Sequence, residues 1–526
     1  MAVEGAAECG TASLSGSKSG AVAAGMHRTS SLLPSLRFAG ALRLFAWVAV
    51  AAGPVGAADY HWDANGKQTG TGGSGDWNTN SASWRLESAT GRLERWRKGP
   101  DAADRAVFGG TSGTVSVGKA ISTNGLLFTT SGYTLTGGTI TLTGIDPSIT
   151  VAGSGADSAT IGAALAGTNV NLVKAGDGVL TLTAVNRFTG TLTVNAGTLR
   201  LGGGTDRDFI NRDAKVVLNA GTIDLGNFIE DTDVFTLNGG TITGGASAAL
   251  GVLTDRAGAA SGFSVRSGTA DVILSDPFAP NWWAGDATSV GLTKTTDGLV
   301  TLTRANTYTG ATRILGGTLV LNGAIRRDSA VTVARGATFA GIGTTNNAPI
   351  TLDGTISPGA VSATGVSDIG ILTTGAQTWN AGGSYVWQIA DAAGAAGTGW
   401  DLLRLGGPLT VAATAADPFK LQLIGLGADG GTGVIAGFDN TRSYVWSLLT
   451  TSAIAGLTAD SVSIDSTWFA AGNPLAGGTF SLARNGTSLD LVFTPVPEPA
   501  TYALALGIGT FLLVAVRRRA RRGSAV

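Results

Sequence analysis

Two short segments come close to known chemical motifs, and each departs from its motif at a residue that the chemistry requires. Gly113–Ala120 approaches a phosphate-binding loop, but Ala120 replaces the hydroxyl that would hold Mg²⁺ and no helical pattern follows. Gly72–Asp76 approaches a calcium-binding Gly-Gly-x-Gly-x-Asp repeat, is one residue short of it and occurs once. The only histidines are His27 and His61, too few for a Ser-His-Asp triad or a histidine-rich metal site. We therefore expect strands and turns at these segments, with no metal and no cofactor.

Acidic, aromatic and basic side chains gather in three other places. Five aspartates could cut or bind a polysaccharide, although such sets are more often a solvated surface: Asp206, Asp208, Asp213, Asp231 and Asp233. Four tryptophans could stack on sugars, although packing at the start of the fold is the favoured interpretation: Trp62, Trp77, Trp84 and Trp96. A basic cluster around Trp96 is expected in a solvated loop: Arg92, Arg95, Arg97 and Lys98. We predict no catalytic residue, because an enzyme would gather three or more carboxylates in one groove.

The C-terminal tail combines a proline-rich break, an apolar run and a basic end. Pro497, Glu498 and Pro499 precede the uncharged run Ala500–Val516, which is followed by Arg517, Arg518 and Arg519. At about 1.5 Å per residue, a helix over this run reaches the short end of a membrane span. Positive charge beyond a span keeps that end in the cytoplasm. We expect a transmembrane helix at 500–516, with a buried C-terminal helix as the alternative.

This tail resembles the PEP-CTERM sorting signal of Gram-negative bacteria over residues 496–522. The resemblance rests on Val496–Ala500, the apolar run and the arginines after it. It implies that an exosortase-type membrane enzyme recognises Pro497, Glu498 and Pro499 and passes the protein to the cell surface. It concerns the destination of the protein and says nothing of an activity.

The N-terminal region has the features of a secretory leader. Arg37 and Arg43 flank the start of an apolar segment, and the small residues after it offer a cleavage site at Ala57 or Ala58. We expect residues 1–57 to be removed after passage through the Sec export machinery, with Met26 as an alternative start. The only cysteine, Cys9, leaves with the leader, so disulfides are not expected. Processing also removes more basic than acidic residues, and an acidic body argues against a nucleic-acid partner.

The central region is rich in glycine, threonine and aliphatic residues. The chain has 81 glycines, 43% hydrophobic residues and 13% charged residues, a composition too apolar for disorder. Threonine and aliphatic residues alternate with period two, as at Val179–Thr183, and glycine interrupts each run, which indicates strands and turns. A Gly-Thr-Ile/Leu triplet recurs at spacings mostly near multiples of 19 or 20 residues, about one coil of a β-helix: Gly138, Gly197, Gly221, Gly240, Gly317 and Gly354. A β-sandwich array is the structural alternative.

Residues 172–201 and 292–321 are two copies of one repeat. Both keep the lysine, aspartate and asparagine positions Lys174/Lys294, Asp177/Asp297 and Asn186/Asn306. The copies resemble the autotransporter-associated β-strand repeat, and the wider resemblance covers roughly residues 60–360. It implies a parallel β-helix passenger, although no C-terminal membrane barrel pattern follows.

These features predict an all-β chain built around a right-handed parallel β-helix, with one C-terminal transmembrane helix. The expected parts are a leader at 1–57, an N-terminal start region at 58–110, the β-helix at 111–360, a β-rich cap at 361–495 and the sorting signal at 496–522. The predicted function is a non-enzymatic, exported surface or matrix protein for structure or adhesion. The alternative is a carbohydrate-binding or polysaccharide-active β-helix protein, so an extracellular polysaccharide is a possible partner.

Overall fold

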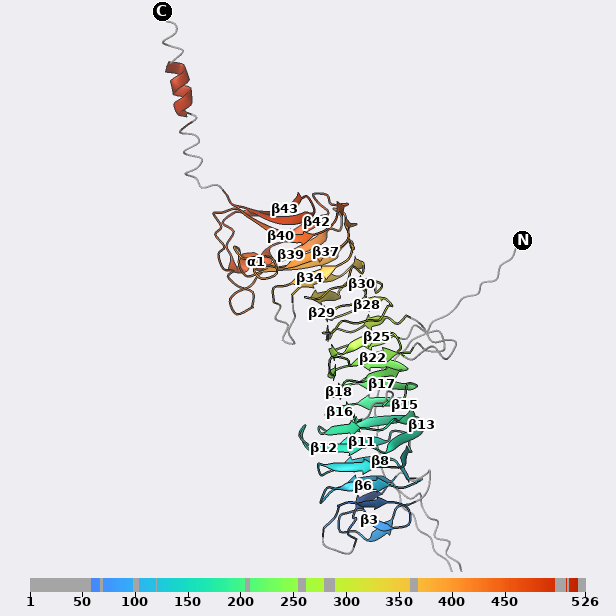
Figure 1. Ribbon diagram of the computed structural model, residues 1–526. Helices are drawn as coiled ribbons and strands as arrows, with labels where there is room; N and C mark the ends of the chain where they lie inside the picture. The colour runs from blue at the N-terminus through green and yellow to red at the C-terminus, as the bar shows by residue number, and fades with distance from the viewer. Residues whose placement is uncertain are drawn as a thin grey trace, which may run out of the picture. The chain divides into compact units, whose positions relative to one another are not determined.

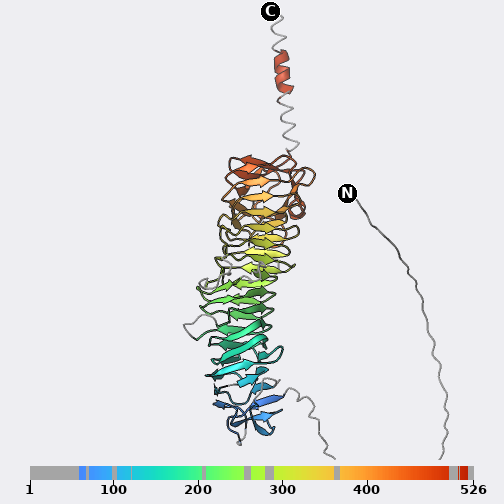
Figure 2. The ribbon, with the colours of Figure 1, turned by 90° about the vertical axis from the view of Figure 1, so that its right-hand side faces the viewer.

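The computed structural model describes residues 58–66, 70–97, 104–119, 121–203, 209–253, 262–278, 289–359, 368–496, 508 and 510–518. Within them the chain is almost entirely β-structure, and its short strands recur in three stacked positions, here called ladders one, two and three (Figure 1, Figure 2). The leader, Ala57, the Pro497-Glu498-Pro499 motif and Arg519 lie outside the described residues.

Ladder one is a sheet of sixteen strands in which all neighbours are parallel. Its strands, in order, are β2 (Gly75–Trp77), β6 (Thr114–Val117), β9 (Tyr133–Thr136), β12 (Ser158–Ile161), β14 (Val179–Leu182), β16 (Thr198–Leu201), β18 (Thr222–Asp224), β21 (Thr241–Thr243), β24 (Gly268–Asp271), β27 (Leu299–Leu302), β29 (Thr318–Leu321), β31 (Thr338–Gly341), β33 (Thr355–Pro358), β36 (Ser384–Ile389), β39 (Phe419–Gly425) and β42 (Val462–Asp465).

Ladder two runs beside it and is also parallel along its length. Its strands are β1 (Asp59–Trp62), β5 (Arg105–Phe108), β8 (Gly125–Phe128), β11 (Ser148–Val151), β13 (Ala164–Ala175), β15 (Arg187–Val194), β17 (Ala214–Leu218), β20 (Val234–Leu237), β23 (Phe263–Val265), β26 (Leu292–Lys294), β28 (Thr312–Ile314), β30 (Val331–Val333), β32 (Ile350–Leu352), β35 (Gln377–Trp379), β38 (Leu409–Val411) and β41 (Ile454–Ala455).

Ladder three is interrupted, because its segments shorten to single bridges in the middle of the chain. It begins with β7 (Ile121–Thr123) and β10 (Thr139–Leu142), which continue into the first halves of β13 and β15. It resumes with β19 (Ile229–Thr232), β22 (Ala249–Val252) and β25 (Ile273–Ser275), and later with β34 (Ile371–Thr374), β37 (Leu402–Leu405) and β40 (Tyr444–Thr450). Between these groups, isolated parallel bridges join Ala305, Ala324, Thr344 and Thr373 in turn.

The order of the strands shows how the chain winds. Each coil contributes one segment to each ladder and then starts the next coil, so residues about twenty apart in sequence become hydrogen-bonded neighbours. Val179, for example, pairs with Thr198, and Thr198 pairs with Thr222. Parallel pairing of this kind supports the solenoid and excludes the β-sandwich array, whose strands would be mainly antiparallel.

Among the described strands, antiparallel pairing of one strand with another occurs only at the two ends of the coils, apart from a few isolated bridges such as Gly341 with Gly359. At the start, β3 (Ala82–Leu86) pairs with β1 and with β4 (Leu93–Arg95). At the end, α1 (Thr467–Gly472) follows β42, and the closing hairpin of β43 (Thr479–Asn485) and β44 (Ser488–Thr494) joins β40. Both ends therefore add hairpins where the parallel ladders stop.

The ladders cross residue 360, where the sequence predicts the β-helix to give way to a separate cap. Strand β32 pairs with β35 and β33 pairs with β36, so the coils on the two sides belong to the same sheets. The change of composition after residue 360 reflects wider coils filled by aromatic residues rather than a change of strand arrangement.

Aliphatic and aromatic side chains fill the interior of the coils. The five leucines predicted to point inward, Leu180, Leu182, Leu199, Leu302 and Leu319, are at most 2% exposed, which confirms that prediction. Along many strands partly exposed and buried positions alternate, as in the pattern of β14. The threonines between the aliphatic residues therefore form the outer surface.

The described part of the tail is helical at Ile508 and at residues 510–518 (Figure 1). Arg517 and Arg518 lie at its end and are exposed. None of the helices in the described part of the chain has the length and apolar character needed to cross a bilayer.

Candidate functional site

The four N-terminal tryptophans form one buried aromatic cluster. Trp62, Trp77 and Trp84 are fully buried and Trp96 is 3% exposed. Trp84 lies 5.0 Å from Trp62, 5.0 Å from Trp77 and 4.7 Å from Trp96, measured between ring centroids. The rings therefore plug the start of the interior, and none of them presents a face on which a sugar could stack.

The neighbouring polar residues support this plug. Arg92 pairs with Glu94, and the Arg97 guanidinium lies 5.6 Å from the centroid of the Tyr60 ring. His61 lies on β1, where burial lowers the pKa of its imidazole. Lys98 is outside the described residues. The basic cluster thus makes local contacts and forms no recognisable anion site among the described residues.

Only three of the five aspartates predicted as a possible carboxylate set lie among the described residues. Asp206 and Asp208 lie outside the described residues, and Asp231 is buried, with its Oδ1 accepting the Phe278 N–H at 3.0 Å. Beside it, the buried carboxylate of Glu230 accepts the N–H groups of Phe209 and Ile210, both at 3.2 Å. These acids hold loop backbone against ladder three. Nowhere in the described ranges do three His, Cys, Asp or Glu residues gather as metal ligands would.

The two near-motifs form strands and turns. Residues 114–117 of the phosphate-loop-like segment are strand β6, and no helix follows them. In the calcium-like segment, Gly72 donates its N–H to the Trp62 carbonyl at 2.9 Å and residues 75–77 are strand β2. Both segments therefore contribute strands and turns to the first coils.

The conserved lysine of the repeat is buried and binds main-chain carbonyls. Lys174 is 1% exposed, and its Nζ donates to the carbonyls of Ala175, Gly176 and Ala196 at 3.1, 2.8 and 3.0 Å. Lys294 is fully buried and donates to the carbonyls of Thr296 and Gly316. Each ammonium group thus joins the corner of its own coil to the corner of the next coil.

Burial affects the charge of both lysines. Removal from water lowers the pKa of Lys174 to about 8, and the nearby Asp177 carboxylate opposes that shift. Burial likewise lowers the pKa of Lys294, opposed by Asp297. Asp177 and Asp297, which occupy the same position in the two repeats, therefore help to retain a buried positive charge.

The conserved asparagine of the repeat makes a second inter-coil link. The Asn186 side chain accepts the Leu165 N–H at 2.8 Å from the preceding coil and donates to the Phe209 carbonyl at 2.6 Å in the following coil. The Asn306 side chain makes the same link: it accepts the Leu274 N–H at 3.0 Å and donates to the Ala324 carbonyl at 3.1 Å. Each asparagine therefore joins three successive coils along ladder three.

Sequence reasoning identified these repeated positions but not their role. The available signal was a lysine and an asparagine at the same positions in both repeats, close to leucines expected to be buried. A buried polar group without a hydrogen-bond partner would destabilise the fold, so such residues should have partners inside. Which carbonyls and N–H groups they satisfy depends on coils that are far apart in sequence.

The C-terminal coils use larger side chains and a buried acid. Asp401 is fully buried, and its carboxylate accepts the N–H groups of Gly370 and Gln388 at 2.9 and 3.0 Å. Burial raises the pKa of Asp401 well above its usual range, although these two N–H groups oppose the shift. The Trp387 indole donates to the Asp401 carbonyl at 2.8 Å. This arrangement fixes a corner between ladders one and three and has no opening to solvent.

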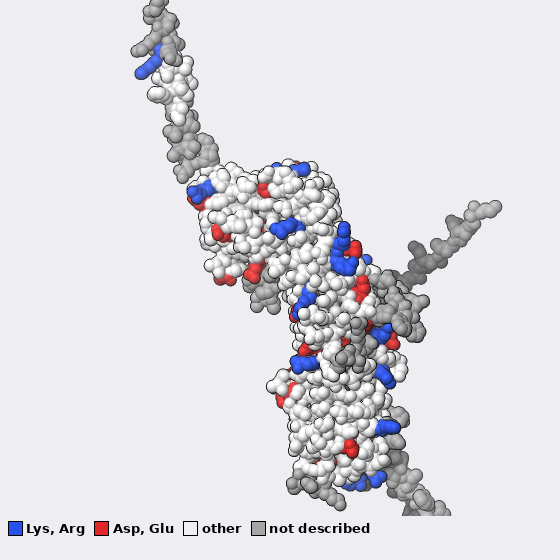
Figure 3. Space-filling model, viewed as in Figure 1, with Lys and Arg blue, Asp and Glu red and all other residues white. Residues whose placement is uncertain are grey.

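Charged residues on the face shown in Figure 3 are few and scattered, without a lined groove of one sign. Several of them pair locally, for example Arg200 with Asp224 at 2.9 Å and Arg304 with Asp271 at 2.7 Å. On this face the described surface therefore consists mainly of uncharged side chains.

Comparison with known proteins finds two similarities. Residues 172–201 and 292–321 each match the family model described as passenger-associated-transport-repeat. The chain is also 40% identical over 205 residues to "Adhesin BmaC autotransporter" of Brucella suis biovar 1 (strain 1330), a match covering 38% of this chain and 6% of that protein. The chain thus spans a small part of the length of this relative. Its similarity to autotransporter passengers therefore consists of the two repeats and this 205-residue match.

Proposed function

We propose that this protein is an exported, non-enzymatic surface protein of a Gram-negative bacterium, with a structural or adhesive role. Its coils would form a right-handed parallel β-helix, presented on the outside of the cell. The observation that carries the proposal is the pair of passenger-associated repeats, whose buried lysines and asparagines hold successive coils in one continuous stack.

The interior of the described coils supports a structural role over catalysis. Three of the buried acids, Glu230, Asp231 and Asp401, accept backbone N–H groups. The tryptophans at the N-terminal end are buried against one another, so they are not available to bind a ligand. The relative named as an adhesin gives the adhesive role its support.

We further propose that the tail directs the protein to the surface. In this proposal an exosortase-type enzyme acts at Pro497, Glu498 and Pro499, after Sec-dependent export and removal of residues 1–57. The apolar run 500–516 would hold the protein in the inner membrane until that step. The support is the order of proline-rich motif, apolar run and arginines in the sequence.

The sorting proposal is tested in the native host with the full chain. Glu498→Ala and a deletion of residues 517–522 are each expected to leave the protein in the inner-membrane fraction. Mass spectrometry of the mature termini locates the cleavage sites. Unchanged surface display in both variants would contradict the sorting role.

The adhesive role is tested separately with cells that display the wild-type protein. Display is expected to increase attachment to surfaces or to extracellular polymer, and cells carrying the mis-sorted Glu498→Ala variant should lose that gain. The purified full chain should release neither reducing ends nor unsaturated products from polysaccharides. Sustained turnover abolished by replacement of one carboxylate would establish the enzymatic alternative instead.

A further inference from the structure

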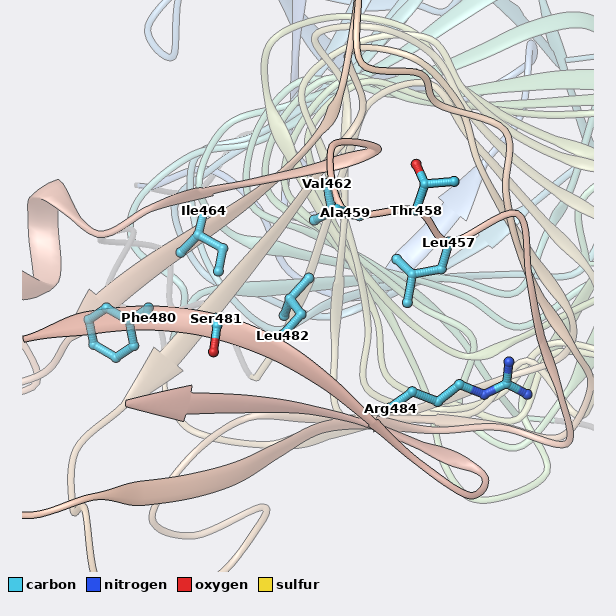
Figure 4. Close-up of a pocket in the computed structure, with 9 residues that line it drawn as sticks. All are labelled: Leu457, Thr458, Ala459, Val462, Ile464, Phe480, Ser481, Leu482 and Arg484. Carbon is cyan, nitrogen blue, oxygen red and sulfur yellow. The ribbon is translucent and has the colours of Figure 1, made fainter. Parts of the chain in front are cut away.

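A groove lies at the C-terminal end of the coils, between β42 and the closing hairpin. Its cavity has a volume of about 610 Å³. Figure 4 shows Ile464 of β42 and Leu482 of β43 directed into the space between the two strands. Val462, Leu457 and Phe480 add to its apolar lining. The groove is therefore walled on two sides by strands and lined mainly by aliphatic and aromatic side chains.

Both walls of the groove are edge strands among the described residues. Ladder one ends at β42, which pairs only with β39, and the closing hairpin ends at β43, which pairs only with β44. In contrast, each strand of ladder one from β6 to β39 has a neighbour on both sides. The closing hairpin extends ladder three through β40, so no described strand pairs with the outer edge of β42.

The hydrogen-bonding groups that β42 directs toward the groove can be identified. Phe419 of β39 donates its N–H to the Ser461 carbonyl at 3.0 Å, so Ser461 directs its main-chain groups toward β39. Successive residues of a strand direct these groups to opposite sides. Val462 and Ile464 therefore present N–H and carbonyl groups on the unpaired side, and such an edge is a template for another strand.

One charged side chain lies among the groove residues. Arg484 is exposed at the far end of β43, and in the described part of the chain it has no carboxylate partner. No acidic residue lines the groove. An occupant with an acidic side chain at this end would complement the charge.

We propose that this groove accepts one extended segment of a partner polypeptide, which adds as a further strand beside β42. The segment would carry apolar side chains at alternate positions, facing Phe480 and Leu482, and an acidic side chain near Arg484. Main-chain hydrogen bonds to Val462 and Ile464 would supply affinity, and the alternating side chains would supply specificity, as in other cases of strand addition. This inference does not depend on the proposed sorting or adhesive role.

A synthetic peptide with the sequence Val-Thr-Val-Thr-Val-Thr-Glu is a suitable probe. Its valines and its glutamate share one face of an extended strand, so the glutamate can reach Arg484 when the valines face Phe480 and Leu482. A fluorescein-labelled copy is titrated with the purified full chain, and fluorescence anisotropy is measured. We expect saturable binding, weakened about tenfold when the acid of the peptide is replaced by lysine.

A charge exchange in the protein distinguishes this groove from other surfaces. Arg484→Glu should weaken binding of the acidic peptide and strengthen binding of the lysine peptide. Arg404→Glu is the matched control, because Arg404 is exposed on β37 and does not line the groove. It should leave both affinities unchanged. An Arg484→Glu variant that retains the preference of the wild type would overturn the proposal.

Hydrogen exchange tests which edge is used. Peptide binding should slow exchange at the amides of Val462 and Ile464 and leave β2, at the opposite end of ladder one, unchanged. Failure to bind, or protection at β2 instead, contradicts the inference. Self-association of the chain that protects Val462 and Ile464 without peptide would identify a second copy as the occupant and reject a separate partner.

Discussion

In the repeat coils (residues 172–201 and 292–321) a buried lysine, Lys174 or Lys294, binds main-chain carbonyls at a corner. In the C-terminal coils (residues 368–465) a buried carboxyl group, that of Asp401, binds main-chain N–H groups instead. The two regions share ladders one and two. They differ in which backbone groups their corners leave unpaired inside. A corner that turns its carbonyls inward needs a donor, and a corner that turns its N–H groups inward needs an acceptor.

The regions also differ in how they fill the interior. The repeat coils are filled mainly by leucine and valine, with Phe188 and Tyr308 as their large aromatic residues, whereas the C-terminal coils contain Trp379, Trp387 and Trp446. Strands β36 and β39 are six and seven residues long, against four residues for β14 and β16. Longer strands enclose a wider interior, which larger side chains must fill to avoid a cavity.

The largest effect should come from removing an aromatic side chain of the C-terminal coils. Trp387 is fully buried and donates to the Asp401 carbonyl, so Trp387→Ala should reduce the free energy of unfolding by about 3–5 kcal/mol. Trp468→Ala is the control, because Trp468 is 51% exposed, and it should have little effect. Urea unfolding followed by circular dichroism measures both. If both variants lost the same free energy of unfolding, the size of the removed side chain, and not its burial, would determine the loss.

A smaller but substantial effect is expected at a glycine corner of the repeat coils. Gly197 has φ of 64°, and a Cβ there would lie 2.4 Å from the Gly176 carbonyl oxygen. Gly197→Ala should therefore cost more than the about 1–2 kcal/mol of left-handed strain alone. Gly486→Ala is the control, since Gly486 has a similar φ of 58° but open space around its Cβ position. If the two variants lose the same stability by urea unfolding, contact with the preceding coil contributes nothing.

The buried lysine link should come next. Lys174→Met keeps much of the side-chain volume but leaves three carbonyls without their donor, at a cost of about 1–3 kcal/mol. Lys294→Met should cost less, since two carbonyls are involved. Lys215→Met, at an exposed position of β17, should be close to neutral. Hydrogen exchange at the corner amides shows whether the loss is local, and protection unchanged in Lys174→Met would contradict an inter-coil link.

The smallest and most discriminating test is the pH dependence of stability. Asp401 has a raised pKa, so the folded state retains a proton that the unfolded state has lost, and its contribution falls as pH rises above the ordinary aspartate range. Lys174 has a pKa lowered to about 8, so its contribution to stability rises with pH between about 8 and the ordinary lysine value. The two regions should therefore have opposite slopes.

Two variants separate these slopes. Asp401→Asn should flatten the decline above the aspartate range and leave the alkaline rise unchanged. Lys174→Met should reduce only the alkaline rise and leave the part that Lys294 contributes. Urea midpoints measured across pH 4 to 10 give both slopes. If either variant altered both the decline and the alkaline rise, the two regions would influence each other's stability. The assignment of one slope to each region would then be wrong.

Much of the fold could be predicted because it depends on local and periodic signals. The alternation at Val179–Leu182 sets which residues face inward, and the Gly-Thr-Ile/Leu triplet marks the corner before a strand of ladder one at Gly197, Gly221, Gly240, Gly317 and Gly354. The triplet at Gly138 is different, because it precedes β10 of ladder three. The identical triplets therefore predicted a corner and a strand but not which ladder that strand would join.

The candidate sites were less predictable, because each depends on partners from other coils. The tryptophans of the N-terminal region were correctly interpreted as packing, since four large rings close together in sequence can bury one another. The aspartates could not be assigned from their spacing, because Asp231 is buried by Phe278 and neighbours that the sequence places far away. The groove between β42 and β43 had no sequence signal, because it arises where one ladder ends and another is extended.

The sequence by itself determined the period of the coils, the inward leucines, the glycine corners and the composition of the outer threonine surface, since each follows from short-range geometry and hydrophobic burial. Only the tertiary structure decided that the ladders continue past residue 360, that Lys174, Asn186 and Asp401 satisfy backbone groups inside, and that ladder one ends in an open edge. The physical reason is that a buried charge or an unpaired strand is defined by its neighbours, and in a solenoid those neighbours come from the adjacent coils.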